Sequence, residues 1–271
     1  MNKQTIFCLL AFIVCLTACE KKDLSPDAQR AFSVSAHDKV LFAPGNLQFS
    51  PAYNQWRFAS SQYDIVGEDN KLISSETRVY LDLFAWGATG AYGIQPWDIT
   101  SEYEHYIPTI VDIAGTQRDW GVASFVRAQL GGEEWYTLSR AEWDYLLTGR
   151  PNAAQLYSRA CVAETNGLLL LPDKWQLPEN SHFTPRTATY AANMYSDAEW
   201  KTLKDEGAIF LPAAGYRSGT SNWTEGGYYW TSTVEPNGNG AYQLQITQEV
   251  VRTIEADPSI GRAVRLARKI K

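Results

Sequence analysis

The part of this chain that follows residue 19 has almost no cysteine. The 271-residue sequence contains four cysteines, and Cys8, Cys15 and Cys19 lie near its start, which leaves Cys161 further along. One cysteine cannot form an internal disulfide, so this part of the chain has to be stabilised by packing. We expect Cys161 to be a small buried hydrophobic residue rather than a reactive thiol.

Histidine is scarce, and the motifs of common catalytic centres are absent. The three histidines, His37, His105 and His182, are widely separated and lack the HExxH spacing of a zinc protease. We expect them on the surface or in loops. The sequence contains neither a GxSxG elbow nor a glycine-rich phosphate loop. It therefore favours a protein that is not an enzyme and that uses no cofactor.

Basic residues are not in excess either. The 24 Lys and Arg residues are outnumbered by 30 Asp and Glu residues, which gives a formal net charge of −6. Such a chain has no electrostatic reason to bind nucleic acid. Aromatic residues are abundant, with ten Trp and fifteen Tyr, and this composition is typical of a globular domain rather than a disordered chain.

The apolar run near the start is too short to span a membrane. It extends from Ile6 to Leu16, about half of the roughly 20 residues that a transmembrane helix needs. Lys3 precedes it, and Ala18-Cys19 follows it, an arrangement that resembles a bacterial lipobox. In that class the chain is cut before the cysteine, whose thiol is acylated. We therefore expect a signal peptide over 1–18, a lipid anchor at Cys19, a polar tether over 19–30 and a single domain over 31–271.

Two short helices have clear start signals. Ser139 with Glu142, and Ser196 with Glu199, have the spacing of capping boxes. Each box is followed by Trp and Leu residues on one helical face, and the second helix is expected to end at Gly207.

The rest of the domain favours short antiparallel strands. Tyr242, Leu244 and Ile246 alternate as in a half-buried strand, and turns are expected at 226–227 and 237–240. Residues 87–121 are rich in Gly, Tyr and Pro without a sustained period, and such long irregular segments are often functional. The fold class is therefore expected to be α+β.

Aromatic side chains near irregular segments are the best candidates for contact with a ligand, because flat apolar rings with a polar edge suit sugars and protein hot spots. Burial in the core, as expected for Trp143, Trp200 and Trp230, is the alternative for each of them. Tyr103, Tyr106 and Tyr229 share this setting, and Arg217 is expected to order a loop. The candidates that we select are Tyr92, Trp97, Trp223 and Tyr228.

Several segments resemble a known family. They are FAPGNLQFSPAYNQWRFASSQYDIVG, DLFAWGATG, RDWGV, WYTLSRAEWDYLLTGRP, GLLLLPDKWQLP, GAIFLPAAGYR, GGYYWTST and GRAVRLA. In this order they resemble Bacteroidetes surface lipoproteins whose cores are similar to the Fibrobacter succinogenes major paralogous domain and, more remotely, to formylglycine-generating enzymes. The resemblance implies a C-type lectin-like fold: two helices against a twisted antiparallel sheet, first and last strands adjacent, and long irregular loops.

The resemblance also permits two site hypotheses to be weighed. Formylglycine-generating enzymes hold copper with a cysteine pair, which Cys161 alone cannot supply. Glu235-Pro236-Asn237 is similar to the calcium-binding triplet of C-type lectins, but the Trp-Asn-Asp sequence of that motif does not follow. A hairpin turn explains the same residues, so we expect no calcium at Glu235 and Asn237.

A carboxylate pair for glycoside hydrolysis is the remaining catalytic alternative, because such pairs meet in space rather than in sequence. The acidic residues crowded in the irregular segment are expected to be solvated instead. They are Asp98, Glu102, Glu104, Asp112 and Asp119.

The sequence thus predicts a non-catalytic lipoprotein of the cell envelope that recognises a glycan or a surface protein. The alternative is a structural accessory or tip subunit of a surface assembly, and a glycoside-active enzyme comes third. We expect attachment to the outer membrane through the acyl chains of Cys19, on the cell surface. The periplasmic face stays open, because Glu20–Asp23 only partly resembles the acidic surface-export signal of Bacteroidetes lipoproteins.

Overall fold

A computed structural model describes residues 25–72, 74–98 and 111–270. The proposed signal peptide and Cys19 lie outside this part of the chain. So do five residues named above from the irregular segment: Glu102, Tyr103, Glu104, His105 and Tyr106.

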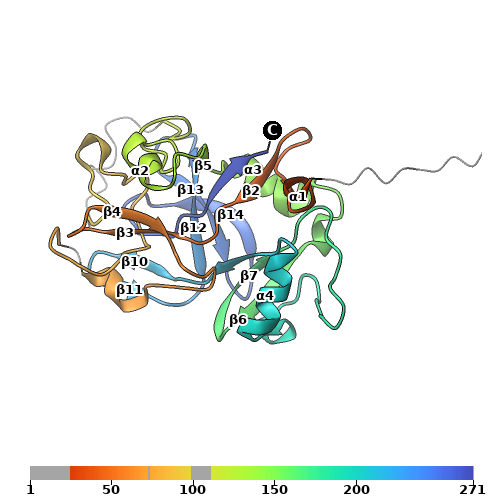
Figure 1. Ribbon diagram of the computed structural model, residues 1–271. Coiled ribbons are helices and arrows are strands. Elements are labelled where there is room, and N and C mark those ends of the chain that lie inside the picture. The colour runs from red at the N-terminus through yellow and green to blue at the C-terminus, as the bar shows by residue number, and fades with distance from the viewer. Residues whose placement is uncertain (1–24, 73, 99–110, 271) are drawn as a thin grey trace, which may run out of the picture.

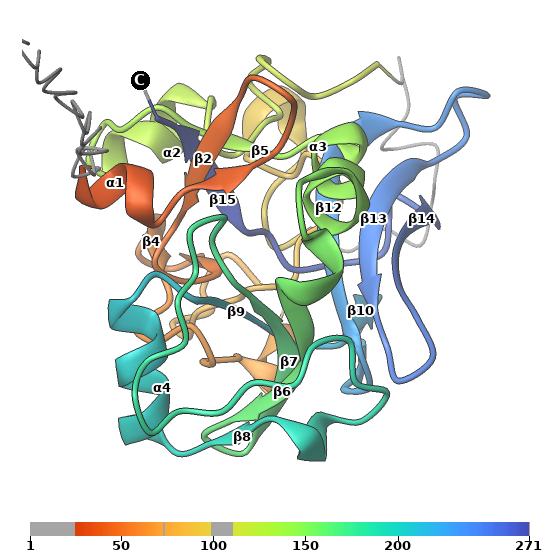
Figure 2. The ribbon, with the colours of Figure 1, turned by 90° about the vertical axis from the view of Figure 1, so that its right-hand side faces the viewer.

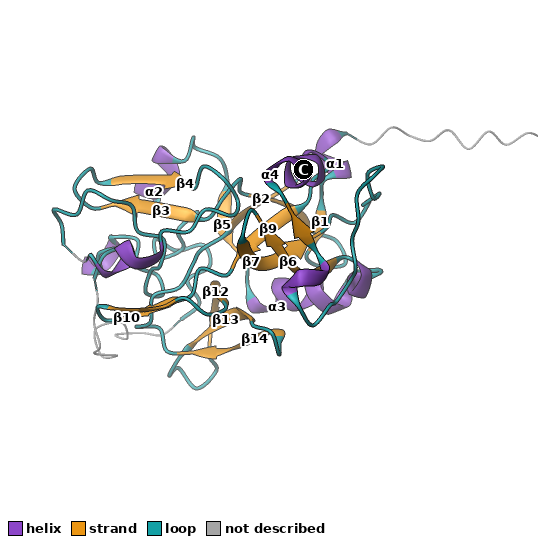
Figure 3. Ribbon diagram, turned by 90° about the horizontal axis from the view of Figure 1, so that it is seen from below, coloured by secondary structure: helices purple, strands orange, loops and turns teal. Residues whose placement is uncertain are grey.

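The described chain has the expected α+β class, with short helices, mostly antiparallel sheets and much loop (Figures 1 and 3). The helices are α1 (Pro26–Gln29), α2 (Ser124–Gln129), α3 (Arg140–Asp144) and α4 (Asp197–Asp205). The strands are β1 (Phe32–Ser33), β2 (Lys39–Phe42), β3 (Leu47–Ser50), β4 (Gln55–Phe58), β5 (Trp135–Thr137), β6 (Tyr157–Val162), β7 (Thr165–Leu170), β8 (Met194–Tyr195), β9 (Ile209–Pro212), β10 (Tyr216–Ser218), β11 (Ser221–Trp223), β12 (Gly227–Val234), β13 (Ala241–Ile246), β14 (Val251–Ala256) and β15 (Leu266–Lys269).

The two ends of the domain lie side by side, as expected. The last strand, β15, pairs antiparallel with β2 on one side and with β5 on the other, in a sheet of order β1-β2-β15-β5. Figure 1 shows the C-terminal end beside β2 and α1. The last strand therefore pairs with the second strand, β2, and shares a sheet with the first strand, β1, without pairing with it.

Two further sheets position the surface discussed below. One has the order β8-β6-β7-β9, in which only β8 runs parallel to its neighbour β6. The other has the order β12-β13-β14. Figure 2 shows the two sheets next to each other, with α4 on the far side of the β6–β9 sheet from β14.

Both expected capping boxes are present. In the first, Ser139 Oγ accepts from the backbone N–H of Glu142, whose carboxylate accepts from the N–H of Ser139. Ser196 and Glu199 make the same reciprocal pair at the start of α4. The helix ends before Gly207, whose φ of +99° is the left-handed conformation expected there.

The core of the described residues is aromatic, and the cysteine in this part of the chain, Cys161, is free. Trp143 packs near Phe42 with ring centres 5.7 Å apart, and Trp200 of α4 packs near Phe210 of β9 at 5.9 Å. The expectation of a buried Cys161 is wrong in degree. This free cysteine lies on β6 and is only partly buried, because its partner in the register of β8, Met194, is itself exposed and lines the same surface hollow.

Within the described residues, no helix combines the length and apolar character that crossing a bilayer requires.

Candidate functional site

Three aromatic rings gather where β10, β11 and β12 meet. The register of the β10–β11 hairpin sets Tyr216 opposite Trp223. Their rings stack with centres 4.9 Å apart and planes inclined by 7°, and the ring of Tyr228 stands at 90° to Tyr216 at 5.4 Å. Trp223 nevertheless keeps 45% of its surface exposed. The arrangement holds an indole at the surface in a fixed orientation.

A buried arginine supports these rings from within. The guanidinium carbon of Arg262 lies 5.8 Å from the ring centre of Tyr216, 5.3 Å from that of Tyr228 and 5.1 Å from that of Trp230. Burial lowers the pKa of Arg262 to about 10, and the nearby tyrosines partly offset this. The group stays charged at neutral pH, so cation–π attraction stabilises the ring cluster.

The β10–β11 hairpin comes so close to residue 215 that this position requires glycine. Gly215 precedes β10 with a φ of +72°, and a Cβ atom there would lie 1.7 Å from the carbonyl oxygen of Trp223. Its N–H donates to the carbonyl of Gly226 at 2.9 Å. The absence of a side chain at Gly215 therefore allows the backbone of Trp223 to pack directly against it.

A cleft of about 530 Å³ opens beside Tyr228. Its walls come from the turns β6–β7, β11–β12 and β13–β14 and from the end of β9. The described residues that line these walls include three glutamates and no Lys, Arg or His. These residues are Ile65, Glu164, Thr165, Asn166, Tyr190, Ala213, Thr224, Glu225, Gly226, Tyr228, Thr247, Gln248 and Glu249.

A shallower hollow of about 330 Å³ continues this cleft, because the two share Asn166, Tyr190 and Gln248. It adds Cys161 and Met194, and Met194 is 57% exposed. Burial raises the pKa of the Cys161 thiol, which keeps it protonated and unreactive. We call the two hollows together with the Trp223 surface the acidic groove.

Tyr92 and Trp97 have other neighbours. Trp97 is half-buried and stacks on Phe49 with ring centres 5.8 Å apart, packed against a core cluster. Tyr92 is 71% exposed, and the guanidinium of Arg118 lies 5.4 Å from its ring centre. The structure thus brings Trp223 and Tyr228 together around Tyr216, while Tyr92 and Trp97 belong to the segment after residue 87.

Two residues considered with these aromatics have structural partners. Tyr229 is fully buried, and its hydroxyl donates to the carbonyl of Pro212 at 2.7 Å. Arg217 donates to the carbonyl of Leu83 at 3.0 Å. It orders a loop, as expected.

Glu235 and Asn237 form a hairpin turn. Asn237 Nδ2 donates to Glu235 Oε1 at 2.7 Å, and the N–H of Gly238 donates to the carbonyl of Glu235 at 2.9 Å. The turn residues therefore bond to one another. Among the described residues, no group of three or more His, Cys, Asp or Glu side chains has an arrangement suited to holding a metal ion.

The acidic residues of the irregular segment are not all solvated, and this corrects an expectation. Asp119 is fully buried, and its Oδ1 accepts from the N–H and the hydroxyl of Thr137. Burial raises its pKa to about 6. Asp98 and Asp112 accept from the backbone N–H groups of Gln95 and Val234 respectively. These contacts indicate structural roles.

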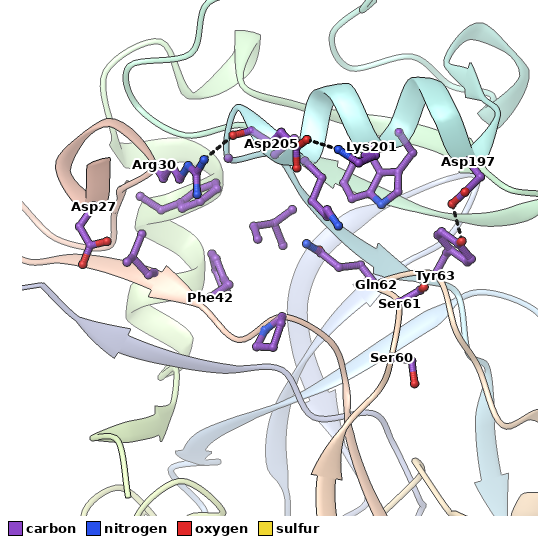
Figure 4. A pocket seen from close by; sticks show the side chains of 18 residues that line it. Asp27, Arg30, Phe42, Ser60, Ser61, Gln62, Tyr63, Asp197, Lys201 and Asp205 are labelled. Carbon is purple, nitrogen blue, oxygen red and sulfur yellow. Dashed lines mark hydrogen bonds and ion pairs between the residues drawn. The ribbon is translucent and has the colours of Figure 1, made fainter. Parts of the chain in front are cut away.

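A second cleft, of about 520 Å³, lies between α1 and α4 over an apolar floor that includes Phe42 (Figure 4). Its polar side chains pair with one another. Tyr63 donates to Asp197 at 2.6 Å, Lys201 pairs with Asp205 at 2.6 Å, and Arg30 donates to the carbonyl of Asp205 at 2.6 Å. Since the bonds of Tyr63 and Arg30 join α4 to its surroundings and the Lys201–Asp205 pair lies within the helix, we assign this cleft a structural role.

Comparison with protein-family models, curated proteins and solved structures found no match for this chain. The site therefore has to be interpreted from its own geometry. The sequence missed Tyr216, Tyr190, Arg262 and the three glutamates of the cleft. The one sequence signal that could have indicated Tyr216 is its position directly after Gly215, in a short segment that turns back to Trp223.

Proposed function

We propose that this protein is a non-catalytic recognition module that binds carbohydrate in the acidic groove. The observation that carries the proposal is the exposed indole of Trp223, stacked on Tyr216 beside a cleft walled by Tyr228 and Tyr190. A sugar ring packs its apolar face on such an indole, while hydroxyl groups bond to neighbouring polar side chains. The mixture of antiparallel sheets and short helices is compatible with a C-type lectin-like fold, which we include in the proposal.

The setting that we propose is the cell envelope. Residues 1–18 act as a lipoprotein signal peptide, and acyl chains on Cys19 anchor the protein to the outer membrane. The groove then presents its aromatic surface to glycans at the cell surface.

A binding role is favoured over glycoside hydrolysis by the state of one cleft carboxylate, that of Glu249. A glycosidase needs a general acid with a raised pKa. The Thr247 hydroxyl instead lowers the pKa of Glu249 below its usual range. An ionised carboxylate at this place suits binding rather than proton donation.

The test is a glycan array with the full-length chain, followed by titration of the glycans that bind. Trp223→Ala removes the stacking surface, and a hot-spot aromatic is worth about 2 kcal/mol or more, so we expect affinity to fall about 30-fold. Tyr53→Ala is the matched control, because Tyr53 is also an exposed aromatic residue, 62% accessible, in the β3–β4 turn. Thermal unfolding of both variants checks that the fold is intact.

Two results would contradict the proposal. Turnover of a bound glycan would make the protein an enzyme. An array without binding, combined with crosslinking of Trp223 to another envelope protein, would favour the structural accessory or tip subunit.

A further inference from the structure

The acidic groove carries charge of one sign. Glu164 comes from the β6–β7 turn, Glu225 from the β11–β12 turn and Glu249 from the β13–β14 turn, and all three line the same cleft. All three residues are exposed. Three turns that are far apart in the sequence therefore direct carboxylates to one place, while the described lining residues carry no compensating cation.

Two cations near this cleft are held behind its walls. Arg159 is buried, and its guanidinium donates to the carbonyls of Thr247 at 2.6 Å and Thr187 at 2.9 Å. Arg262 is buried under the rings of Tyr216 and Tyr228. Arg159 also helps to lower the pKa of Glu249, but neither guanidinium belongs to the described lining, whose charged side chains are the three glutamates.

From this charge pattern we propose that the acidic groove selects glycans that carry free, protonated amino groups. This inference rests on the carbohydrate-binding function proposed above. An ammonium group in the cleft would be attracted by the carboxylates of Glu225 and Glu249. Tyr190 and Tyr228 would offer it aromatic faces, while a neighbouring sugar ring lies on Trp223.

Other ligand chemistries fit the groove less well. An acidic glycan would meet like charges. A divalent cation needs several ligands at one point, and the described residues hold no suitable group of three. A neutral glycan would gain hydrogen bonds from its hydroxyl groups to the carboxylates, but no attraction between opposite charges. The two hollows, of about 530 Å³ and about 330 Å³, share a wall, and this combined space favours an oligosaccharide.

The test compares two ligands that differ only at nitrogen: the β-1,4-linked pentamer of glucosamine and the same pentamer fully N-acetylated. Calorimetric titration of the full-length chain at low salt and about pH 5.5, where the amines are protonated and the glutamates are ionised, should give at least about tenfold tighter binding of the free amine, since several exposed charge pairs contribute. The preference should shrink in about 1 M salt, where the screening length is about 3 Å.

Variants locate the effect. Glu225→Gln and Glu249→Gln should each weaken binding of the glucosamine pentamer about two- to fivefold, and should leave binding of the acetylated pentamer unchanged. Glu206→Gln is the matched control, because Glu206 is an exposed glutamate at the end of α4 and does not line the groove. It should change neither affinity.

The outcomes separate this inference from the proposed function. Equal affinity for the two pentamers, or preference for the acetylated one, overturns the amine selectivity and leaves carbohydrate binding in place. Absence of binding to both pentamers and to every glycan on the array overturns both proposals. Tighter binding of pentalysine than of the glucosamine pentamer, lost in Glu225→Gln, would make the ligand a basic peptide and overturn the glycan assignment.

Discussion

Two buried aspartates predict an unusual dependence of stability on pH. Asp82 and Asp119 are fully buried. Asp82 accepts from Asn70 Nδ2 at 2.8 Å and from the N–H of Val66 at 3.0 Å. Removal from water raises the pKa of each carboxyl to about 6, and the hydrogen bonds only partly oppose this rise. In the unfolded chain both groups titrate near 3.9.

The direction and magnitude of this pH dependence follow from the pKa values of the two aspartates. Because the folded pKa lies above the unfolded one, the folded state binds protons more readily. The stabilising effect is complete below about pH 4 and is lost as the pH rises through 6. A shift of about two units corresponds to about 3 kcal/mol for each group, since one unit is worth about 1.4 kcal/mol.

Other carboxylates determine how far the pH can fall before the fold loses stability again. Hydrogen bonds and ion pairs lower the pKa of Asp38 and Glu199, and also that of Asp173 despite its partial burial. Such groups stabilise the fold above their unfolded pKa, and this stability is lost as the pH falls through their folded pKa. The free energy of unfolding should therefore be greatest near pH 4–5.

The assay is urea unfolding of the full-length chain, followed by tryptophan fluorescence between pH 4.5 and 7.5. We expect the free energy of unfolding to fall by several kcal/mol over this range, and Asp119→Asn or Asp82→Asn to remove about half of the fall. Titration of the carboxyl carbons by NMR gives the pKa values even if one variant does not fold. A free energy that stays constant or rises from pH 4.5 to 7.5 would refute the reasoning.

Two backbone predictions concern the groove. Gly215→Ala should destabilise the fold by about 3 kcal/mol or more in urea unfolding, because its Cβ would collide with the Trp223 carbonyl. Gly93→Ala is the control: Gly93 also has a positive φ, but no described atom lies within 4 Å of a Cβ there, so the cost should be only about 1 kcal/mol. Equal losses of stability in the two variants would contradict the argument. Ala163 and Glu164 form the β6–β7 turn with φ of +44° and +66°, values that Asn and Gly adopt more easily. The double replacement Ala163→Asn with Glu164→Gly should therefore raise the free energy of unfolding by about 1 kcal/mol, and it should weaken binding of the glucosamine pentamer because a glutamate is lost. A lower free energy of unfolding would show that this turn is not strained.

The features that could be predicted from the sequence are those determined by neighbouring residues. Both capping boxes could be predicted because the serine and the glutamate that bond to each other are only three residues apart. The alternation of Tyr242, Leu244 and Ile246 gave the strand β13 for the same local reason.

The features that could not be predicted depend on contacts between distant segments. Asp119 is buried because Thr137 of β5 lies against it, and nothing in the residues around Asp119 indicates this. The acidic groove combines three turns that span residues 164 to 249. Trp223 and Tyr228 could be selected only because they flank a glycine turn, whereas Arg262 under Tyr216 had no local signal.

Buried arginines explain how a loop-rich domain with one free cysteine is held together. Arg265 is fully buried and donates to Asn46 at 3.0 Å and to the carbonyl of Phe210 at 2.8 Å, which joins segments that are 219 and 55 residues away from it. Arg150 donates to the carbonyl of Leu146, four residues away, and to that of Leu171, 21 residues away. Irregular backbone leaves many buried carbonyls without a ladder partner, and each would be costly if unpaired. A guanidinium has five donors in one plane, so it can satisfy several of these carbonyls at once. Loss of one arginine would leave acceptors unpaired in two or three segments together. These arginines therefore link distant segments, as disulfides do in many exported domains.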